Sequence, residues 1–118
     1  MQSKISKYTV NYFNEEEFHH LKREIFTNDC YYFKTKKENP LIIDVGTYIG
    51  LSVLYFKKIY PYSKVIAFEP NPLAFKLLKE NLFINNIEDV ELHKSAIHKS
   101  NGDKELYIDD TDMDRYSV

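Results

Sequence analysis

Apolar residues in the central part of the chain alternate between short continuous runs and segments of helical spacing. Residues 41–45 and 64–68 are apolar runs typical of parallel strands that are covered on both faces. After each run, apolar residues return every three or four positions, which predicts a helix. They are Leu51, Leu54, Tyr55 and Ile59 after the first run, and Ala74, Leu77, Leu78 and Leu82 after the second. Strands that alternate with helices predict βαβ units and a parallel sheet.

Capping residues mark both ends of the second of these helices. Asn71 is suited to cap its N-terminus, and Pro72 then occupies the first helical position, where a missing N–H costs nothing. Asn85 and Asn86 supply a left-handed stop at its C-terminus. The first helix ends before Pro61.

The flanking segments follow weaker patterns. Residues 1–13 show no clear period, and Asn14 is suited to cap a helix predicted at about 14–26, because three glutamates follow it. Residues 90–97 open with alternating apolar and polar positions, which predicts a half-exposed strand near a sheet edge. Asn101-Gly102 predicts a hairpin turn, and "KELYI" supplies the return strand.

The chain is long enough for one small α/β domain. It has 118 residues, of which 43% are hydrophobic, so one core can form but two domains cannot. We expect a lead-in over residues 1–39 and a partial Rossmann-like domain over residues 40–108. Residues 109–118 form an acidic tail, without a core pattern, or the start of a further part.

Composition excludes several classes of function. A formal net charge of −2 argues against an electrostatic nucleic-acid binder. No apolar run reaches the roughly 18 residues that a spanning helix needs, and the N-terminus lacks the apolar core of a secretory leader. The single cysteine, Cys30, suits a reducing compartment. We expect a soluble, cytoplasmic protein with no nucleic-acid and no membrane partner.

No metal site is predicted. His93, His98 and Cys30 lack the spacing of metal ligands. Glu16 and His19 have the i, i+3 spacing of some helix-bundle metal sites, but a single copy without partners is more typical of a solvated helix face. Asp110, Asp112 and Asp114 imitate the start of a calcium loop, but Arg115 stands where such a loop requires glycine.

The loop "DVGTYIG" after the first strand is the candidate ligand site. In open α/β sheets, ligands bind outside the carboxyl ends of the strands. Gly46 lets the backbone turn as it leaves the strand, and Gly50 lets the next helix pack close to the sheet. Glu69 ends the second strand, where an acidic residue commonly accepts hydrogen bonds from ribose hydroxyls. The alternative is that the glycines only make a tight strand-to-helix connection.

Charge and space favour one class of nucleoside. In the dinucleotide pattern G-x-G-x-x-G that starts at Gly46, the later glycines are replaced by Tyr48 and Leu51. A side chain at the second position crowds a pyrophosphate, and the carboxylate of Asp44 repels one. The same carboxylate suits an ammonium group, such as that of S-adenosylmethionine, which also carries a ribose and no phosphate. A nicotinamide-dependent (NAD) oxidoreductase remains the alternative.

Three stretches together resemble the FkbM-type family of S-adenosylmethionine-dependent methyltransferases. They are "LIIDVGTYIGLSV", "VIAFEPNPLAFKLLKENLFINN" and "VELHKSAIHKSNGDKELYI". The resemblance spans about residues 40–108 and implies a Rossmann-like class I methyltransferase sheet. It also implies S-adenosylmethionine as the methyl donor, and an oxygen of a small molecule or sugar as the acceptor.

The resemblance implies a donor-binding role for nine positions. Asp44, Gly46 and Gly50 match the family's first motif, at the methionine end of the donor, and Glu69 matches the acidic residue that holds the ribose. Pro70 shapes the adjacent loop, and Ser95 and Ala96 lie near the adenine. Thr47 and Tyr48 stand where the family often has Ala and Asn, and Ser95 where many class I methyltransferases have an aspartate.

A class I methyltransferase sheet has seven strands, and only the first part of one is recognisable here. The fourth strand and its acidic D-x-E-G segment are absent from the chain, so we expect the N-terminal, donor-binding portion of a longer protein. The edge of strand 41–45 would be unpaired, which favours a homo-oligomer through that edge. A non-catalytic fragment or interaction module is the alternative function.

Overall fold

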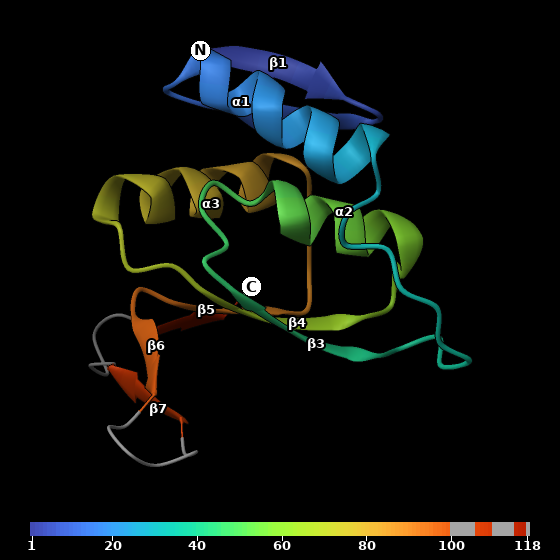
Figure 1. Cartoon of the computed structure of the whole chain (residues 1–118), viewed down its shortest axis with the longest axis vertical. Coiled ribbons are helices and arrows are strands. Elements are labelled where there is room, and N and C mark those ends of the chain that lie inside the picture. Colours follow the sequence, from blue (N-terminus) through green and yellow to red (C-terminus); the bar gives the residue numbers. More distant parts are fainter. Residues whose placement is uncertain (100–105, 110–114, 118) are drawn as a thin grey trace.

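The computed structural model describes residues 1–99, 106–109 and 115–117 (Figure 1). In chain order its elements are β1 (Gln2–Ile5), β2 (Tyr8–Asn11), α1 (Glu15–Lys22), the π-helical η1 (Arg23–Thr27), β3 (Leu41–Val45), α2 (Leu51–Ile59), β4 (Lys64–Phe68), α3 (Pro72–Ile84), β5 (Val90–His93), β6 (Ala96–Lys99), β7 (Leu106–Asp109) and β8 (Arg115–Ser117). The predicted turn at Asn101-Gly102 and most of the acidic tail lie outside the described residues.

The main sheet has the strand order β3-β4-β5-β8. Its first three strands are parallel, with Ile42 opposite Val65 and Val65 opposite Val90, whereas β8 is antiparallel to β5. Helices α2 and α3 connect the parallel strands, so the predicted βαβ units and α/β fold are confirmed. Two further pairs, β1-β2 and β6-β7, form separate antiparallel sheets, the second of which confirms the predicted hairpin strands.

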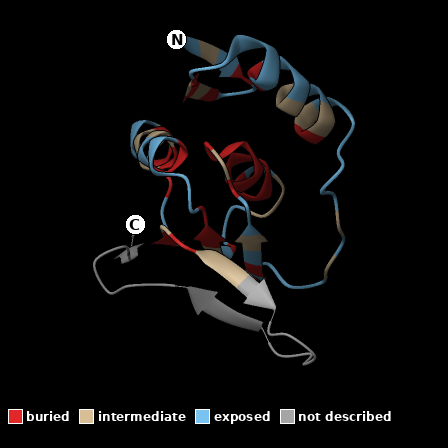
Figure 2. Cartoon of the chain, turned by 60° about the vertical axis from the view of Figure 1, so that its left-hand side comes forward, coloured by how far each residue is buried: buried red, intermediate tan, exposed pale blue. Residues whose placement is uncertain are grey.

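Helices α2 and α3 cover one face of the main sheet and form the core with it (Figure 1). Figure 2 shows α2 as buried along most of its length, from Leu51 to Lys57. The predicted cap of α3 is confirmed, because the Asn71 side chain accepts hydrogen bonds from the N–H groups of Leu73 and Ala74, both at 3.0 Å. None of the helices in the described part of the chain is long and apolar enough to cross a membrane.

The opposite face of the sheet is open beside β3. Leu41, Ile43 and Val45 are 62%, 60% and 58% exposed, whereas Ile42, which points to the helices, is 8% exposed. Strand β3 is also at the edge of the sheet, as predicted. The prediction that this strand is covered on both faces is wrong for the described chain, because α2 and α3 both pack on the same side.

Residues 1–27 form a layer that lies on the helices, on the side away from the sheet (Figure 1). We call these residues the N-terminal layer. The helix predicted at about 14–26 is present as α1 and η1, and Asn14 caps it by accepting a hydrogen bond from the N–H of Glu17 at 2.9 Å. Residues 1–13, which show no periodicity, contain the hairpin β1-β2.

Side-chain amides attach this hairpin to α3. Asn85 accepts a hydrogen bond from the N–H of Thr9 at 2.8 Å and donates one to its carbonyl oxygen at 2.7 Å. Asn81 makes the same pair of bonds with Asn11, at 2.7 and 3.0 Å. The two asparagines therefore pair with the edge of β2 as a neighbouring strand would.

The C-terminal strands differ from the prediction in two ways. The strand expected over residues 90–97 is divided: β5 ends at His93, the chain bends, and β6 begins at Ala96 in another sheet. β5 is also not an edge strand, because β8 pairs with its outer side. Residues 115–117, expected to be part of a tail without a core pattern, form that strand.

Candidate functional site

The carboxyl ends of β3, β4 and β5 lie next to one another, as the parallel register requires. The N–H groups of Gly46 and Thr47 both donate to the carbonyl oxygen of Phe68, at 2.8 and 3.1 Å. The N–H of Glu69 donates to the carbonyl oxygen of His93 at 3.0 Å. The loops after β3 and β4 therefore leave the sheet side by side, and the predicted site residues of both loops are brought together.

The loop after β3 depends on three residues with positive φ. Gly46, Tyr48 and Gly50 have φ angles of 74°, 57° and 103°. At Gly50 an added Cβ would lie 2.9 Å from Cδ1 of Leu78 on α3, whereas at Gly46 no atom lies within 4 Å of such a Cβ. Gly50 thus allows α2 to begin close to α3, and Gly46 serves the turn alone.

Glu69 joins the two loops through its carboxylate. Oε1 accepts a hydrogen bond from the N–H of Tyr48 at 2.7 Å, and Oε2 accepts one from the N–H of Asn71 at 2.9 Å. The side chain is buried, with a residue exposure of 6%. Each carboxylate oxygen can accept a second hydrogen bond, so the group can hold both loops and still accept from a ligand hydroxyl.

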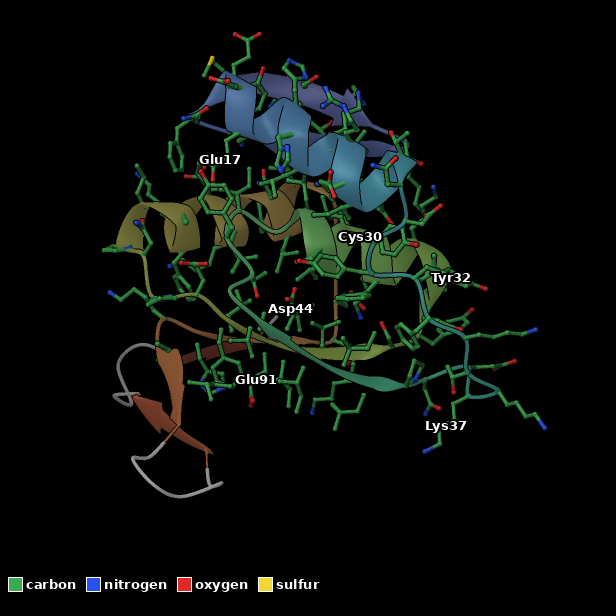
Figure 3. All side chains as sticks on the ribbon, in the orientation of Figure 1. Glu17, Cys30, Tyr32, Lys37, Asp44 and Glu91 are labelled. Carbon is green, nitrogen blue, oxygen red and sulfur yellow. The ribbon has the colours of Figure 1, made fainter. Side chains whose placement is uncertain are left out.

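Asp44 lies on β3 below α2, on the side of the sheet that the helices cover (Figure 3). Its Oδ2 accepts a hydrogen bond from the hydroxyl of Ser52 in the first turn of α2, at 2.5 Å. The hydroxyl of Thr47 donates to the backbone carbonyl of Asp44 at 3.0 Å. Burial raises the pKa of the Asp44 carboxyl, and the Ser52 hydrogen bond opposes this rise. The carboxylate is thus a poorly solvated anion that a cationic ligand would stabilise.

The side chain of Tyr48 contacts the N-terminal layer. Its hydroxyl donates to Oε2 of Glu17 at 2.9 Å, and its ring lies edge-on to Phe13 with centroids 5.7 Å apart. Burial and the hydrogen bond to Glu17 raise the pKa of the Tyr48 phenol. Tyr48 therefore contributes its backbone N–H to the site, while its ring faces the N-terminal layer.

Ser95 and Ala96 follow the end of β5, at the third strand end of the site. The Ser95 hydroxyl is buried and makes no hydrogen bond with the described part of the protein. An unpaired buried hydroxyl is costly, which makes it a candidate contact for a ligand. Pro70, beside Glu69, is exposed.

Asn81 is a residue of the site region that was not predicted from the sequence. It is fully buried in α3, and besides its two bonds to Asn11 it donates to the carbonyl oxygen of Ile49 at 2.8 Å. It therefore connects the N-terminal layer to the loop after β3. Its position within the apolar stripe between Leu78 and Leu82 is the signal that could have identified it.

The hollows beside Pro61 and Tyr62 lie away from these residues. Two cavities of about 320 Å³ each are found beside Pro61 and Tyr62, one lined also by Lys57 and Asn85 and the other by Thr35 and neighbouring residues. They lie at the amino ends of the strands. The strand-end site is identified by its chemistry rather than by cavity size, and neither cavity includes its residues.

Comparisons with known proteins show that the chain is similar to methyltransferases. The chain is 45% identical over 64 residues to Methyltransferase sdnD of Sordaria araneosa, covering 54% of this chain and 25% of that protein. It is 39% identical over 75 residues to the 31-O-demethyl-FK506 methyltransferase FkbM of Streptomyces tacrolimicus, covering 62% and 29%. The chain thus spans between a quarter and a third of the length of these relatives. No family model matches the chain.

A solved structure bears on the fold. The crystal structure of M. jannaschii TYW2 in complex with AdoMet matches 77% of this chain and 41% of its own, with a TM-score of 0.55 at 22% identity. At this identity the match concerns the fold alone, and it agrees with the predicted sheet. Over the part that the chain spans, its resemblance to the S-adenosylmethionine-dependent methyltransferases of the FkbM type is therefore confirmed.

Proposed function

We propose that this chain is the donor-binding part of an S-adenosylmethionine-dependent methyltransferase. The observation that carries the proposal is the Glu69 carboxylate, which holds the loops after β3 and β4 together beside a second carboxylate, Asp44. Two anionic groups at adjacent strand ends suit a ligand that has an ammonium group and a ribose but no phosphate. The methyltransferase relatives support the same donor.

Each part of the site has a proposed role towards the donor. Asp44 would pair with the ammonium group of the methionine part, since burial has left its carboxylate poorly solvated. Glu69 would accept hydrogen bonds from the ribose hydroxyls. The remaining positions supply backbone or adenine contacts: Gly46, Thr47, Tyr48 and Gly50 in the first loop, Pro70 beside Glu69, and Ser95 and Ala96 after β5.

The reaction of the complete protein is proposed to be methyl transfer to an oxygen of a small molecule or sugar. The donor supplies a methyl group on a positively charged sulfur. An acceptor oxygen attacks the methyl carbon, the C–S bond breaks with its electron pair going to sulfur, and the hydroxyl proton passes to a base. The described residues would contribute to this step by holding the donor in a fixed orientation. A relative that acts on 31-O-demethyl-FK506 supports an oxygen acceptor.

We also propose that the free edge of β3 pairs with the same edge of a second copy of the chain. Leu41, Ile43 and Val45 form an exposed apolar surface next to a strand edge that pairs with no other strand among the described residues, and such an edge is prone to strand addition. A two-fold axis at that edge would make the two β3 strands antiparallel and continue the sheet. The oligomer would thus satisfy the backbone hydrogen-bonding groups at this edge of the sheet.

Calorimetric titration of S-adenosylmethionine into the chain tests the proposed donor. We expect saturable binding, much weaker binding after Glu69→Ala, and no binding of NAD. Glu88→Ala is the matched control, because Glu88 is an exposed glutamate at the amino end of β5. Binding of NAD in place of the methyl donor would contradict the proposal, as would equal effects of the two glutamate variants.

A further inference from the structure

The N-terminal layer contacts the loop after β3 at two separate places. One contact runs from Glu17 and Phe13 to the side chain of Tyr48, and the other runs from Asn11 through Asn81 to the carbonyl oxygen of Ile49. Figure 3 shows Glu17 at the start of α1, pointing toward the region of this loop. Two consecutive residues of the loop are therefore held by elements outside the sheet.

Tyr48 is the residue at which these contacts reach the site. Its φ of 57° is in the left-handed region, which residues other than glycine, asparagine and aspartate rarely adopt. Such a conformation persists where surrounding contacts hold it. The hydroxyl bond to Glu17 and the ring contact with Phe13 hold the side chain, and the bond from the Tyr48 N–H to Glu69 is made in this conformation.

We infer that the N-terminal layer acts as a clamp that holds the loop after β3 in its conformation, with Tyr48 as the positioning residue. The clamp acts in sequence: Glu17 holds the Tyr48 hydroxyl, the Tyr48 backbone is kept left-handed, and its N–H orients the carboxylate of Glu69. This inference rests on the proposed function, because the benefit of orienting Glu69 is a preformed contact for the ribose. Preorganised contacts bind more tightly since less order is lost on binding.

The geometry separates this role from direct contact with the donor. The Tyr48 ring and hydroxyl are engaged with Phe13 and Glu17, so the side chain acts through Glu69. A conservative change, Tyr48→Phe, keeps the ring and removes only the hydroxyl bond. Glu17→Ala removes the same bond from the other side, on an exposed helix position where little else changes. If the clamp operates through this bond, the two changes have the same consequence and are not additive.

The test compares Tyr48→Phe, Glu17→Ala, the double variant and the control Glu16→Ala, which changes the adjacent exposed glutamate of α1. Two quantities are measured: affinity for S-adenosylmethionine by calorimetry, and hydrogen exchange of the Tyr48 amide without donor. Loss of one hydrogen bond of about 1 kcal/mol corresponds to about a fivefold change. We expect about fivefold weaker binding and about fivefold faster exchange in each single variant, no further change in the double variant, and wild-type values for Glu16→Ala.

The two readouts distinguish failure of the clamp from failure of the proposed function. Unchanged Tyr48 exchange and unchanged donor affinity in Tyr48→Phe would overturn the clamp while leaving the donor site in place. Faster exchange in both single variants of a chain that does not bind S-adenosylmethionine would support the clamp and overturn the donor. Equal effects of Glu16→Ala and Glu17→Ala would also overturn the clamp, because such effects would reflect the charge of the helix rather than the hydrogen bond to Tyr48.

Discussion

Around β3, the two faces of the main sheet have opposite environments. Toward the helices, Ile42, Val65 and Ala67 are 8%, 0% and 0% exposed, and they pack into one core with α2 and α3. On the other face of β3, Leu41 and Ile43 are 62% and 60% exposed. The apolar content of the two faces is similar, so the difference comes from which neighbours the chain supplies and not from the residues of the strand.

This contrast explains which part of the proposed site the chain can build alone. The loop after β3 is supported from the helix side by Leu78 and Asn81 of α3 and by the N-terminal layer. The described part of the chain therefore holds the loops of the proposed site from the helix side, and it leaves an apolar surface beside them that favours association.

The largest expected effect distinguishes the covered face from the open one. Leu82→Ala removes a fully buried side chain of α3 from the hydrophobic core. The substitution should lower the free energy of unfolding by about 2–5 kcal/mol. Ile43→Ala on the open face should change it by less than about 0.5 kcal/mol. Urea unfolding measures both, and equal losses would mean that the open face is covered in solution.

The two glycines of the site should differ in the next largest effect. Gly50→Ala forces a Cβ against Leu78 in addition to the left-handed strain, and should cost about 2–3 kcal/mol. Gly46→Ala meets open space and should cost about 1–2 kcal/mol from the backbone alone. Thermal unfolding provides the measurement, and a larger loss for Gly46→Ala would show that the steric contact with α3 is unimportant.

A charge on the open face should prevent association with little effect on folding. Ile43→Lys places an ammonium group on the strand edge, so we expect the proposed dimer to become monomeric while the free energy of unfolding of the monomer changes by less than about 0.5 kcal/mol. Sedimentation velocity measures the oligomer. Leu73→Lys is the matched control, because Leu73 is 53% exposed on α3, and loss of the dimer in this variant instead would place the interface elsewhere.

The smallest effect concerns pH. Burial raises the pKa of Asp44, so the favourable contribution of its protonated form is fully present below the unfolded pKa of about 3.9 and is lost as pH rises through the raised folded value. Asp44→Asn should remove this part of the pH dependence of unfolding. Donor affinity should change in the opposite direction and fall as pH is lowered through the same pKa, since the ammonium group needs the carboxylate. Urea unfolding of wild type and Asp44→Asn over a range of pH checks the first statement, and calorimetric titration of both with S-adenosylmethionine checks the second.

The order of elements from β3 to α3 was predictable because each has a strong local signal. Apolar runs mark the strands, and Asn71 with Pro72 marks the start of α3. The meeting of Gly46 and Glu69 also followed from the sequence, since parallel strands place their carboxyl ends together.

The N-terminal layer was not predictable, because long-range side-chain contacts define it. Asn81 meets Asn11 across 70 positions, and Asn85 meets Thr9 across 76. Tyr48 and Glu17 are separated by 31 positions, and neither residue carries a local signal of the other. The division between β5 and β6 was missed for a related reason: the alternation that begins at Val90 stops at Lys94, but only strand pairing assigns the two parts to different sheets.

Mapping the ligand by amide NMR would test the central claim most directly, namely that the loops after β3 and β4 form the donor site. Titration with S-adenosylhomocysteine, the demethylated donor, should shift the amides of residues 44–50, 69–71 and 95–96. The amides of residues 85–89, which line a cavity at the opposite ends of the strands, should remain unchanged. Shifts confined to residues 85–89, or none at all in a folded chain at millimolar ligand, would contradict the account.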